Sequence, residues 1–291
     1  FLGSVMQATQ IPHGTQQNEL DAASMGNAAR KSPSYFDHDL AELDAMMAYM
    51  PAGDHLETSR RPPYTFKSGA VYDGEWKGCM RHGYGMQQWA DGTSYAGEWR
   101  DSRAEGHGRF IHCEGETYIG QWKGNTAHGM GVYIHKDQST YTGEWVNDLQ
   151  EGYGVETWSE GSRFEGNFRS GQKEGWGRYV WPDDAEYHGS WDGNCINGYG
   201  KYVGSDQRSF CGTWRDSVIH GLGQYSWPDG RKFSGQYRFD KKEGFGIFQW
   251  PDGRLYEGYW SRGKQHGHGI YSMPDGISKI AQWKDGKCLK E

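Results

Sequence analysis

A repeat of 23 residues constrains this chain more than any other feature. Tyr or Phe recurs nine times at this interval, from Tyr72 to Tyr256, without insertion or deletion. Gly follows two positions later in every copy, and Trp, Phe or Tyr two positions after that, as in Gly74 and Trp76. A Gly-x-Gly pair closes each copy, at 83–85 in the first. So strict a period is typical of arrays in which each unit packs on its neighbours.

The spacing within a copy predicts two β-strands joined by a turn. The two aromatic residues and the first Gly lie at i, i+2 and i+4, so a strand places all three on one face. A second strand of about six residues begins at Tyr84. WPDG sequences at 227–230 and 250–253 are turns that link one hairpin to the next. We therefore predict an all-β fold, a single-layer, elongated antiparallel meander of tandem β-hairpins.

Aromatic rings and glycine take the place of an aliphatic core. The 291 residues include 45 Gly and 14 Trp, and aromatic residues reach 15%. Average Gly usage is about 7%, so glycine is enriched about twofold. We expect the Tyr and Trp rings to lie over bare glycine backbone on one face of the sheet. The rings then form the core of the repeats, and a ligand groove is the further role left open for some of them.

The aromatic face is a candidate groove for a partner protein. A single-layer sheet leaves part of its own core uncovered, and such a face suits an extended or helical segment. The groove residues are Tyr72, Trp76, Tyr95, Trp99, Tyr118, Trp122, Tyr141, Trp145, Phe164, Trp181, Tyr187, Trp191, Trp214, Trp227, Trp250, Tyr256 and Trp260.

Composition divides the chain into four parts. Residues 1–31 are rich in Gln, Asn, Ala and Gly and are expected to be flexible. Residues 32–51 predict an amphipathic helix, and residues 52–63 a mostly flexible linker. The repeat domain is expected to span residues 64–286, with a half-repeat before Tyr72 and a degraded repeat, in which Trp283 keeps the register, at its end.

The predicted helix begins near Ser32 or Ser34 as N-cap and ends at Pro51. Acidic residues near its start, such as Asp39 and Glu42, suit the helix dipole. Its apolar docking face comprises Phe36, Leu40, Leu43, Met47 and Met50, which follow a helical period. We expect it to cap or cover the repeat sheet; the alternative is a docking helix for a partner.

Charge and cysteine content exclude several classes of protein. The net charge of −7 argues against binding nucleic acid, although Lys241, Lys242 and Arg262 form a local basic cluster that suits anionic lipid. The five cysteines lack CxxC spacing, which argues against a disulfide framework or a zinc site and favours a cytoplasmic protein. No apolar run approaches the ~20 residues of a membrane span.

The residue before each Gly-x-Gly pair varies between His, Glu and Asn, as in His82 and Glu105. A place that varies in this way suits no catalytic or metal-binding role, and we expect its side chain to fix a turn by hydrogen bonding. The sequence contains no GxSxG, HExxH or Cys–His constellation. We therefore predict a protein that is not an enzyme and has no catalytic residues, metal site or cofactor.

The segment YDGEWKGCMRHGYG, residues 72–85, fits the motif YxGxWxxGxxHGxG at every fixed place. The chain thus resembles the membrane occupation and recognition nexus (MORN) repeat family from Tyr64 to about Trp283. The resemblance implies a scaffold or adaptor, because MORN proteins as a family occur in cytoskeletal, ciliary, flagellar and cortical membrane-linked assemblies. It implies protein partners, cytoskeletal or motor-associated, and a cytoplasmic location at the cytoskeleton or a membrane.

Three alternatives stay open beside the scaffold. Exposed Trp and Tyr side chains suit direct binding of membrane lipid. The chain is also compatible with a regulatory region of a larger enzyme, because MORN repeats precede catalytic domains in some lysine methyltransferases and lipid kinases. Unpaired edges at the ends of the sheet are compatible with a homodimer.

Overall fold

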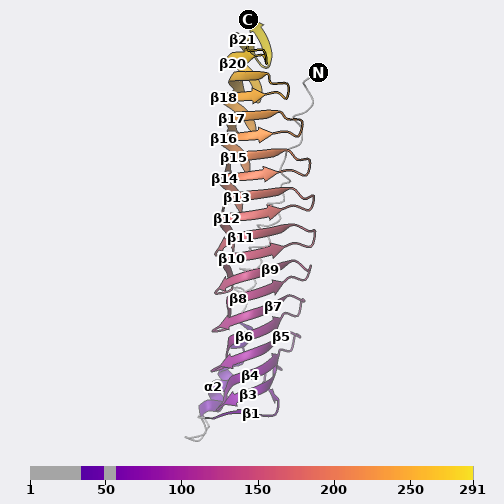
Figure 1. Ribbon diagram of the computed structural model, residues 1–291. Coiled ribbons are helices and arrows are strands. Elements are labelled where there is room, and N and C mark those ends of the chain that lie inside the picture. Colours follow the sequence, from indigo (N-terminus) through magenta and orange to yellow (C-terminus); the bar gives the residue numbers. More distant parts are fainter. Residues whose placement is uncertain (1–33, 49–56, 291) are drawn as a thin grey trace. The chain divides into compact units, whose positions relative to one another are not determined.

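The computed structural model describes residues 34–48 and 57–290. Within these residues the chain forms two compact units. The first unit comprises residues 34–48, 57–154 and 169–172, and the second comprises residues 155–168 and 173–290. The described strands belong to one open antiparallel sheet, and helix is confined to the N-terminal side of the first unit (Figure 1). The predicted all-β repeat fold is confirmed.

Four short elements precede the complete repeats. They are the 3₁₀ turn η1 (Tyr35–Asp37), the helix α2 (Leu40–Ala48), and the strands β1 (Thr58–Arg60) and β2 (Tyr64–Thr65).

Each complete repeat supplies a strand of seven residues and then a strand of nine, both longer than the sequence predicts. The seven-residue strands are β3 (Val71–Lys77), β5 (Ser94–Arg100), β7 (Thr117–Lys123), β9 (Thr140–Val146), β11 (Arg163–Arg169), β13 (Glu186–Asp192), β15 (Ser209–Arg215), β17 (Lys232–Arg238), β19 (Leu255–Ser261) and β21 (Ser278–Lys284). The nine-residue strands are β4 (Met80–Gln88), β6 (Arg103–Ile111), β8 (Thr126–Ile134), β10 (Leu149–Thr157), β12 (Gln172–Val180), β14 (Cys195–Val203), β16 (Val218–Ser226), β18 (Lys241–Gln249) and β20 (Lys264–Ser272), and β22 (Lys287–Lys290) ends the series.

A β-bulge recurs at the same place in the hairpins of the repeats. In the first repeat Gly74 lies opposite Gly85 and Trp76 lies opposite Arg81, so Glu75 of β3 faces three residues of β4 and the extra residues of the bulge belong to β4. The Glu75 Oε2 atom accepts a hydrogen bond from the backbone N–H of Tyr84 at 3.1 Å. Bulges at equivalent positions recur in later repeats, for example between β17 and β18.

The first aromatic ring of a repeat covers the paired glycines. A Cβ atom added to Gly85 would lie 2.3 Å from Tyr72 Oη and 2.5 Å from its Cζ. The Tyr72 hydroxyl donates to the carbonyl oxygen of Glu75 at 2.9 Å. Its ring meets Trp76 at 5.0 Å and Trp99 of the next repeat at 5.5 Å, both edge to face. The prediction that rings lie over glycine backbone is confirmed, and edge-to-face ring contacts hold one repeat to the next.

Hydrogen bonds add further links between repeats. The indole N–H of Trp99 donates to the carbonyl of Gly85 at 3.1 Å. The predicted turn-fixing role is confirmed for Glu at this position, because Glu105 accepts from the N–H of Gly124 at 3.0 Å and Glu243 from that of Arg262 at 2.8 Å. Each of these side chains satisfies a backbone donor in the turn of the following hairpin. The role is not general for His, because the Nδ1 atoms of His128 and His220 are buried without a hydrogen-bond partner among the described residues.

Three predicted boundaries differ in the structure. Strand β1 lies within the predicted 52–63 linker, and its Thr58 pairs with Lys77 of β3. The sheet continues past the predicted end at residue 286, because β22 pairs with β21. The single predicted helix is wrong: a turn separates η1 from α2, and Ser34 makes no side-chain capping hydrogen bond. Residues 1–33 and 49–56, which include Ser32, Met50 and Pro51, lie outside the described part of the chain.

Candidate functional site: an aromatic docking surface

The predicted groove residues are mainly core. Fifteen of the seventeen are buried, whereas Trp227 and Trp250 in the second unit are half-buried. Most of these rings are therefore buried by packing within the repeats themselves. Their contact with a partner stays a prediction, and it depends on the few ring faces that packing leaves open.

In the first unit, the N-terminal segment occupies the aromatic surface. Phe36, in η1, is only 3% exposed. Five rings from three repeats surround it, and we call them the Phe36 pocket. Their centroids lie 5.2 to 6.1 Å from that of Phe36, and they belong to Tyr95, Trp89, Trp122, Trp99 and Phe110.

Arg81 of β4 places a positive charge beneath this pocket. Its side chain is 0% exposed, and its Nη2 atom donates to the carbonyl oxygens of Phe36 at 3.1 Å and Ser102 at 3.0 Å. Its guanidinium also lies over the Trp99 ring, 4.5 Å from the centroid. Burial lowers the pKa of Arg81 to about 10, so the group stays charged at neutral pH and binds the docked backbone.

Asp39 supplies the matching negative charge from the docked segment. Its carboxylate, in a residue 2% exposed, accepts hydrogen bonds from Ser68 Oγ at 2.6 Å and Gln87 Nε2 at 2.8 Å. Gln87 in turn accepts a hydrogen bond from Arg81. A buried charge is costly unless it is paired or hydrogen-bonded, so the acid and the guanidinium depend on the segment being docked.

The helix that follows continues the docking. Leu43 is buried, Leu40 half-buried and Met47 exposed, so the predicted apolar face is only partly used. Glu42 accepts from the N–H of Lys67 at 2.9 Å and from the Tyr64 hydroxyl at 2.7 Å. The hydrogen bond from Lys67 is the main reason why the pKa of Glu42 is lowered. Glu42 and Asp39, predicted to serve the helix dipole, instead bind the repeats.

Phe36→Ala is expected to release residues 34–48 from the repeats. Removing a buried Phe side chain costs about 3–5 kcal/mol, and here it also opens the pocket over Arg81 and Asp39. Hydrogen exchange of the Leu43 amide, which donates to the Asp39 carbonyl at 3.1 Å, should lose its protection. Met47→Ala is the control, because Met47 is exposed. Unchanged exchange in Phe36→Ala would contradict the anchoring role of this ring.

Two later repeats carry a buried lysine in the place of Arg81. Lys173 Nζ lies 2.7 Å from Glu156 Oε2, and 4.8 Å from the centroid of Trp158. Four other copies have Ala or Ile in this place, as in Ala104 and Ile196, and two have Gln, at Gln150 and Gln265. The occurrence of Arg or Lys in some copies and of Ala or Ile in others at one place of the repeat is the signal of burial that sequence analysis missed.

Lys242 is the second of these lysines, and it lies among rings alone. Its Nζ atom is 4.6 to 5.1 Å from the centroids of Phe248, Phe233, Trp260 and Trp227. No described residue forms an ion pair or a side-chain hydrogen bond with it. Burial, with a smaller effect of Arg231, lowers its pKa to about 7. The predicted exposed basic cluster is therefore wrong, because Lys241 and Arg262 are exposed and Lys242 is not.

Sequence analysis also missed a row of exposed side chains, which we call the ridge. It consists of the residue between the two glycines of each closing pair, apolar in seven of nine copies. The ridge of the first unit is Tyr84, His107, Met130 and Tyr153, and that of the second unit is Trp176, Tyr199, Leu222, Phe245 and His268. Trp176 and Leu222 are 55% and 64% exposed. Apolar residues repeated at an outward-facing place are the signal that identifies it.

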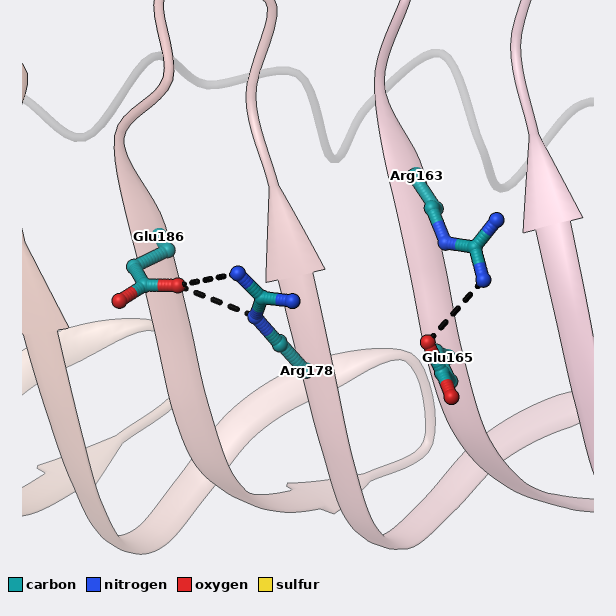
Figure 2. Close-up of polar contacts among 4 residues, drawn as sticks. All are labelled: Arg163, Glu165, Arg178 and Glu186. Carbon is teal, nitrogen blue, oxygen red and sulfur yellow. Dashed lines mark hydrogen bonds and ion pairs between the residues drawn. The ribbon is translucent and has the colours of Figure 1, made fainter.

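Exposed ion pairs lie on the strands of the second unit. Figure 2 shows Arg178 of β12 facing Glu186 of β13, whose Oε2 atom accepts from Nη2 at 2.7 Å and Nε at 3.0 Å. Arg163 and Glu165 pair at 3.1 Å within β11. Exposed pairs of this kind contribute about 0–1 kcal/mol, so they give the surface polarity rather than stability.

The described residues contain no group of three or more His, Cys, Asp or Glu side chains arranged to hold a metal ion. None of the helices in this part of the chain has the length and hydropathy needed to cross a bilayer. None of the five cysteines, all of which lie in the described part of the chain, forms a disulfide.

The solved structures described next are distant likenesses. The TCP10 domain of Danio rerio CPAP is 12% identical, with 79% of this chain and 99% of that chain covered and a TM-score of 0.39. The Drosophila melanogaster SAS-4 TCP domain, solved with a proline-rich motif of Ana2, is 11% identical, with 77% and 90% covered and a TM-score of 0.29. Likenesses of this size carry no inference about function. No curated protein matches the sequence.

The model of the MORN repeat matches nine consecutive segments. They are residues 72–94, 95–117, 118–140, 141–163, 164–185, 187–207, 210–230, 233–253 and 256–278. These matches cover most of the chain and follow the period of the hairpins. The chain belongs to the MORN-repeat family.

Proposed function

We propose that this protein is a non-catalytic scaffold that binds a segment of a partner protein on the aromatic surface of its repeats. The observation that supports this most is the docking of residues 34–43, in which an aromatic anchor, a buried acid and a helix all contact the repeats of the first unit. A surface that holds one peptide segment of this chemistry is suited to hold another. We place the scaffold in a cytoskeletal, ciliary, flagellar or cortical membrane-linked assembly of the cytoplasm, on the strength of its repeat family.

Affinity capture followed by direct binding tests this function. The full chain and its Phe36→Ala variant serve as baits, and each captured protein is then purified and titrated against the bait. We expect a cytoskeletal or motor-associated partner that binds directly and saturably. A partner bound only by Phe36→Ala would make the N-terminal segment an autoinhibitory lid. Failure of every purified candidate to bind either bait would contradict the scaffold.

A second candidate function, lipid binding, is favoured by the second unit's ridge. Trp, Tyr, Leu and Phe side chains point into solvent there, and aromatic rings are stable at the membrane interface. The residue between the first Gly and the second aromatic residue of each repeat lies beside the ridge, as Glu75 does beside Tyr84, and it differs between the units. These residues include Glu75, Glu98 and Glu144 in the first unit, and they are Asn167, Ser190, Thr213, Gln236 and Tyr259 in the second. The second ridge therefore lacks one source of repulsion from anionic lipid.

Vesicle flotation separates the two candidates. If the second ridge binds lipid, the double variant Trp176→Ser/Phe245→Ser should reduce the fraction that floats with phosphatidylserine-containing vesicles at least threefold. The matched control is Tyr84→Ser/Met130→Ser, which removes two exposed ridge residues of the first unit. Absence of the wild-type chain from the floating fraction would reject lipid binding and leave the scaffold unaffected.

A further inference from the structure

The Phe36 pocket has an equivalent in the second unit, seven repeats further along the sequence. Adding 161 positions, seven times the repeat of 23, to each of its residues leads to an aromatic residue in every case. Trp89, Tyr95, Trp99, Phe110 and Trp122 become Trp250, Tyr256, Trp260, Tyr271 and Trp283. The same step takes Arg81 to Lys242. We call this set the second pocket.

The rings of the second pocket have the geometry of the first. Tyr256 meets Trp260 and Trp283 edge to face, both at 5.4 Å. The equivalent contacts of Tyr95, with Trp99 and Trp122, are 5.0 and 5.3 Å and are also edge to face. The repeat backbone therefore places both sets of rings alike.

The two pockets differ in how far they are covered. Phe36 packs on Trp89 and Trp122, and both indoles are buried. Their equivalents Trp250 and Trp283 are half-buried. The second pocket thus leaves Trp250 and Trp283 partly exposed, with the Arg254 guanidinium 5.5 Å from the Trp250 centroid, where the first pocket holds a peptide.

Charge identifies the kind of segment that fits. Arg81 has the carboxylate of Asp39 nearby, on the docked segment, and Lys173 has Glu156 within its own unit. Lys242, 6% exposed, has neither. A partner that brings a carboxylate next to an aromatic side chain would supply the counter-ion that Lys242 lacks.

We propose that the second pocket binds a peptide segment of a partner protein in which an acidic residue follows an aromatic residue by three positions, as Asp39 follows Phe36. The aromatic side chain enters between Trp250, Tyr271 and Trp283, and the carboxylate pairs with Lys242. This proposal rests on the proposed scaffold function and names the site and chemistry of its partner.

The test uses the full chain, whose own segment occupies the first pocket at high effective concentration. The probe is a labelled synthetic peptide, SYFDHDLAEL, with the sequence of residues 34–43. We expect saturable binding that Lys242→Met weakens at least tenfold. Lys241→Met removes the neighbouring exposed charge and should leave binding unchanged. Peptides with the changes Phe36→Ala or Asp39→Asn should also bind at least tenfold more weakly.

Thermal unfolding shows whether each variant is folded, and Met suits the ring-lined site of Lys242 because it is apolar and similar in length. Equal binding of the peptide by wild type and Lys242→Met would overturn the proposal, and so would no binding at all. A dimer that the peptide dissociates would make a second copy of the chain the occupant and overturn the assignment to a partner. If captured partners bind wild type and Lys242→Met equally well, the scaffold stands and this site is wrong.

Discussion

Gly85→Ala is expected to destabilise the first repeats by about 3 kcal/mol or more. The added Cβ would lie 2.3 to 2.6 Å from three atoms of the Tyr72 side chain. That ring is completely buried and hydrogen-bonded to Glu75, so it has no free space into which to move. Overpacking a tight core typically costs 1–3 kcal/mol and sometimes more. Urea unfolding combined with hydrogen exchange of β3, β4 and β5 measures the loss.

Two further variants separate the collision from other effects of replacing glycine. Gly92→Ala has no atom within 4 Å of its new Cβ, but its φ of +92° is strained for Ala, which costs about 1 kcal/mol. In the Tyr72→Leu background, Gly85→Ala should cost less than it does alone, because the colliding ring atoms are gone. An equal cost with and without Tyr72 would show that the ring does not determine the need for glycine.

Lys242→Met is expected to stabilise the protein, by about 3 kcal/mol at pH 6. Burial lowers the pKa of Lys242 from its ordinary value of 10.5 to about 7. A shift of this size corresponds to about 4–5 kcal/mol, and the attraction of the surrounding rings for the cation offsets about 1–2 kcal/mol of it. Methionine keeps the ring contacts and removes the charge.

The stabilisation by Lys242→Met should decrease as the pH rises. Between the folded pKa of about 7 and the unfolded value of 10.5 the unfolded chain binds more protons at this site, so the stability of wild type rises with pH across this range. The advantage of Lys242→Met is therefore full below pH 7 and declines toward pH 10. Lys241→Met should change the free energy of unfolding by less than about 0.5 kcal/mol. If the difference in free energy of unfolding between Lys242→Met and wild type were constant from pH 6 to pH 10, it would refute the claim that Lys242 is buried with a lowered pKa.

Retaining a destabilising lysine is consistent with a binding role. Residues that reduce stability are retained most often where function needs them. In the first unit the buried cation has the partners that Lys242 lacks. Arg81 donates a hydrogen bond to the backbone carbonyl of the docked Phe36 and lies near the carboxylate of Asp39.

The sequence by itself determined the repeat architecture of this protein. The interval from Tyr72 to Tyr95 and the alternation of Tyr72, Gly74 and Trp76 require hairpins with one aromatic face, since strand geometry has a period of two. The His or Glu position before each closing glycine pair predicted a turn hydrogen bond, which Glu105 and Glu243 form. These features are local or depend only on neighbouring repeats, so aligning the repeats of this one sequence is enough to predict them.

Tertiary structure decided which side chains of the repeats are covered and which are open. Sequence periodicity placed Phe36 on a helix but did not identify its pocket, because that contact joins residues more than 50 positions apart, as from Phe36 to Trp89. The same holds for Lys242, which looks like a surface charge next to Lys241 until four rings from strands β17, β18 and β19 and the 227–231 turn are brought around it. Burial and pairing of a charge depend on which distant groups the fold brings together, and this cannot be read from neighbouring residues alone.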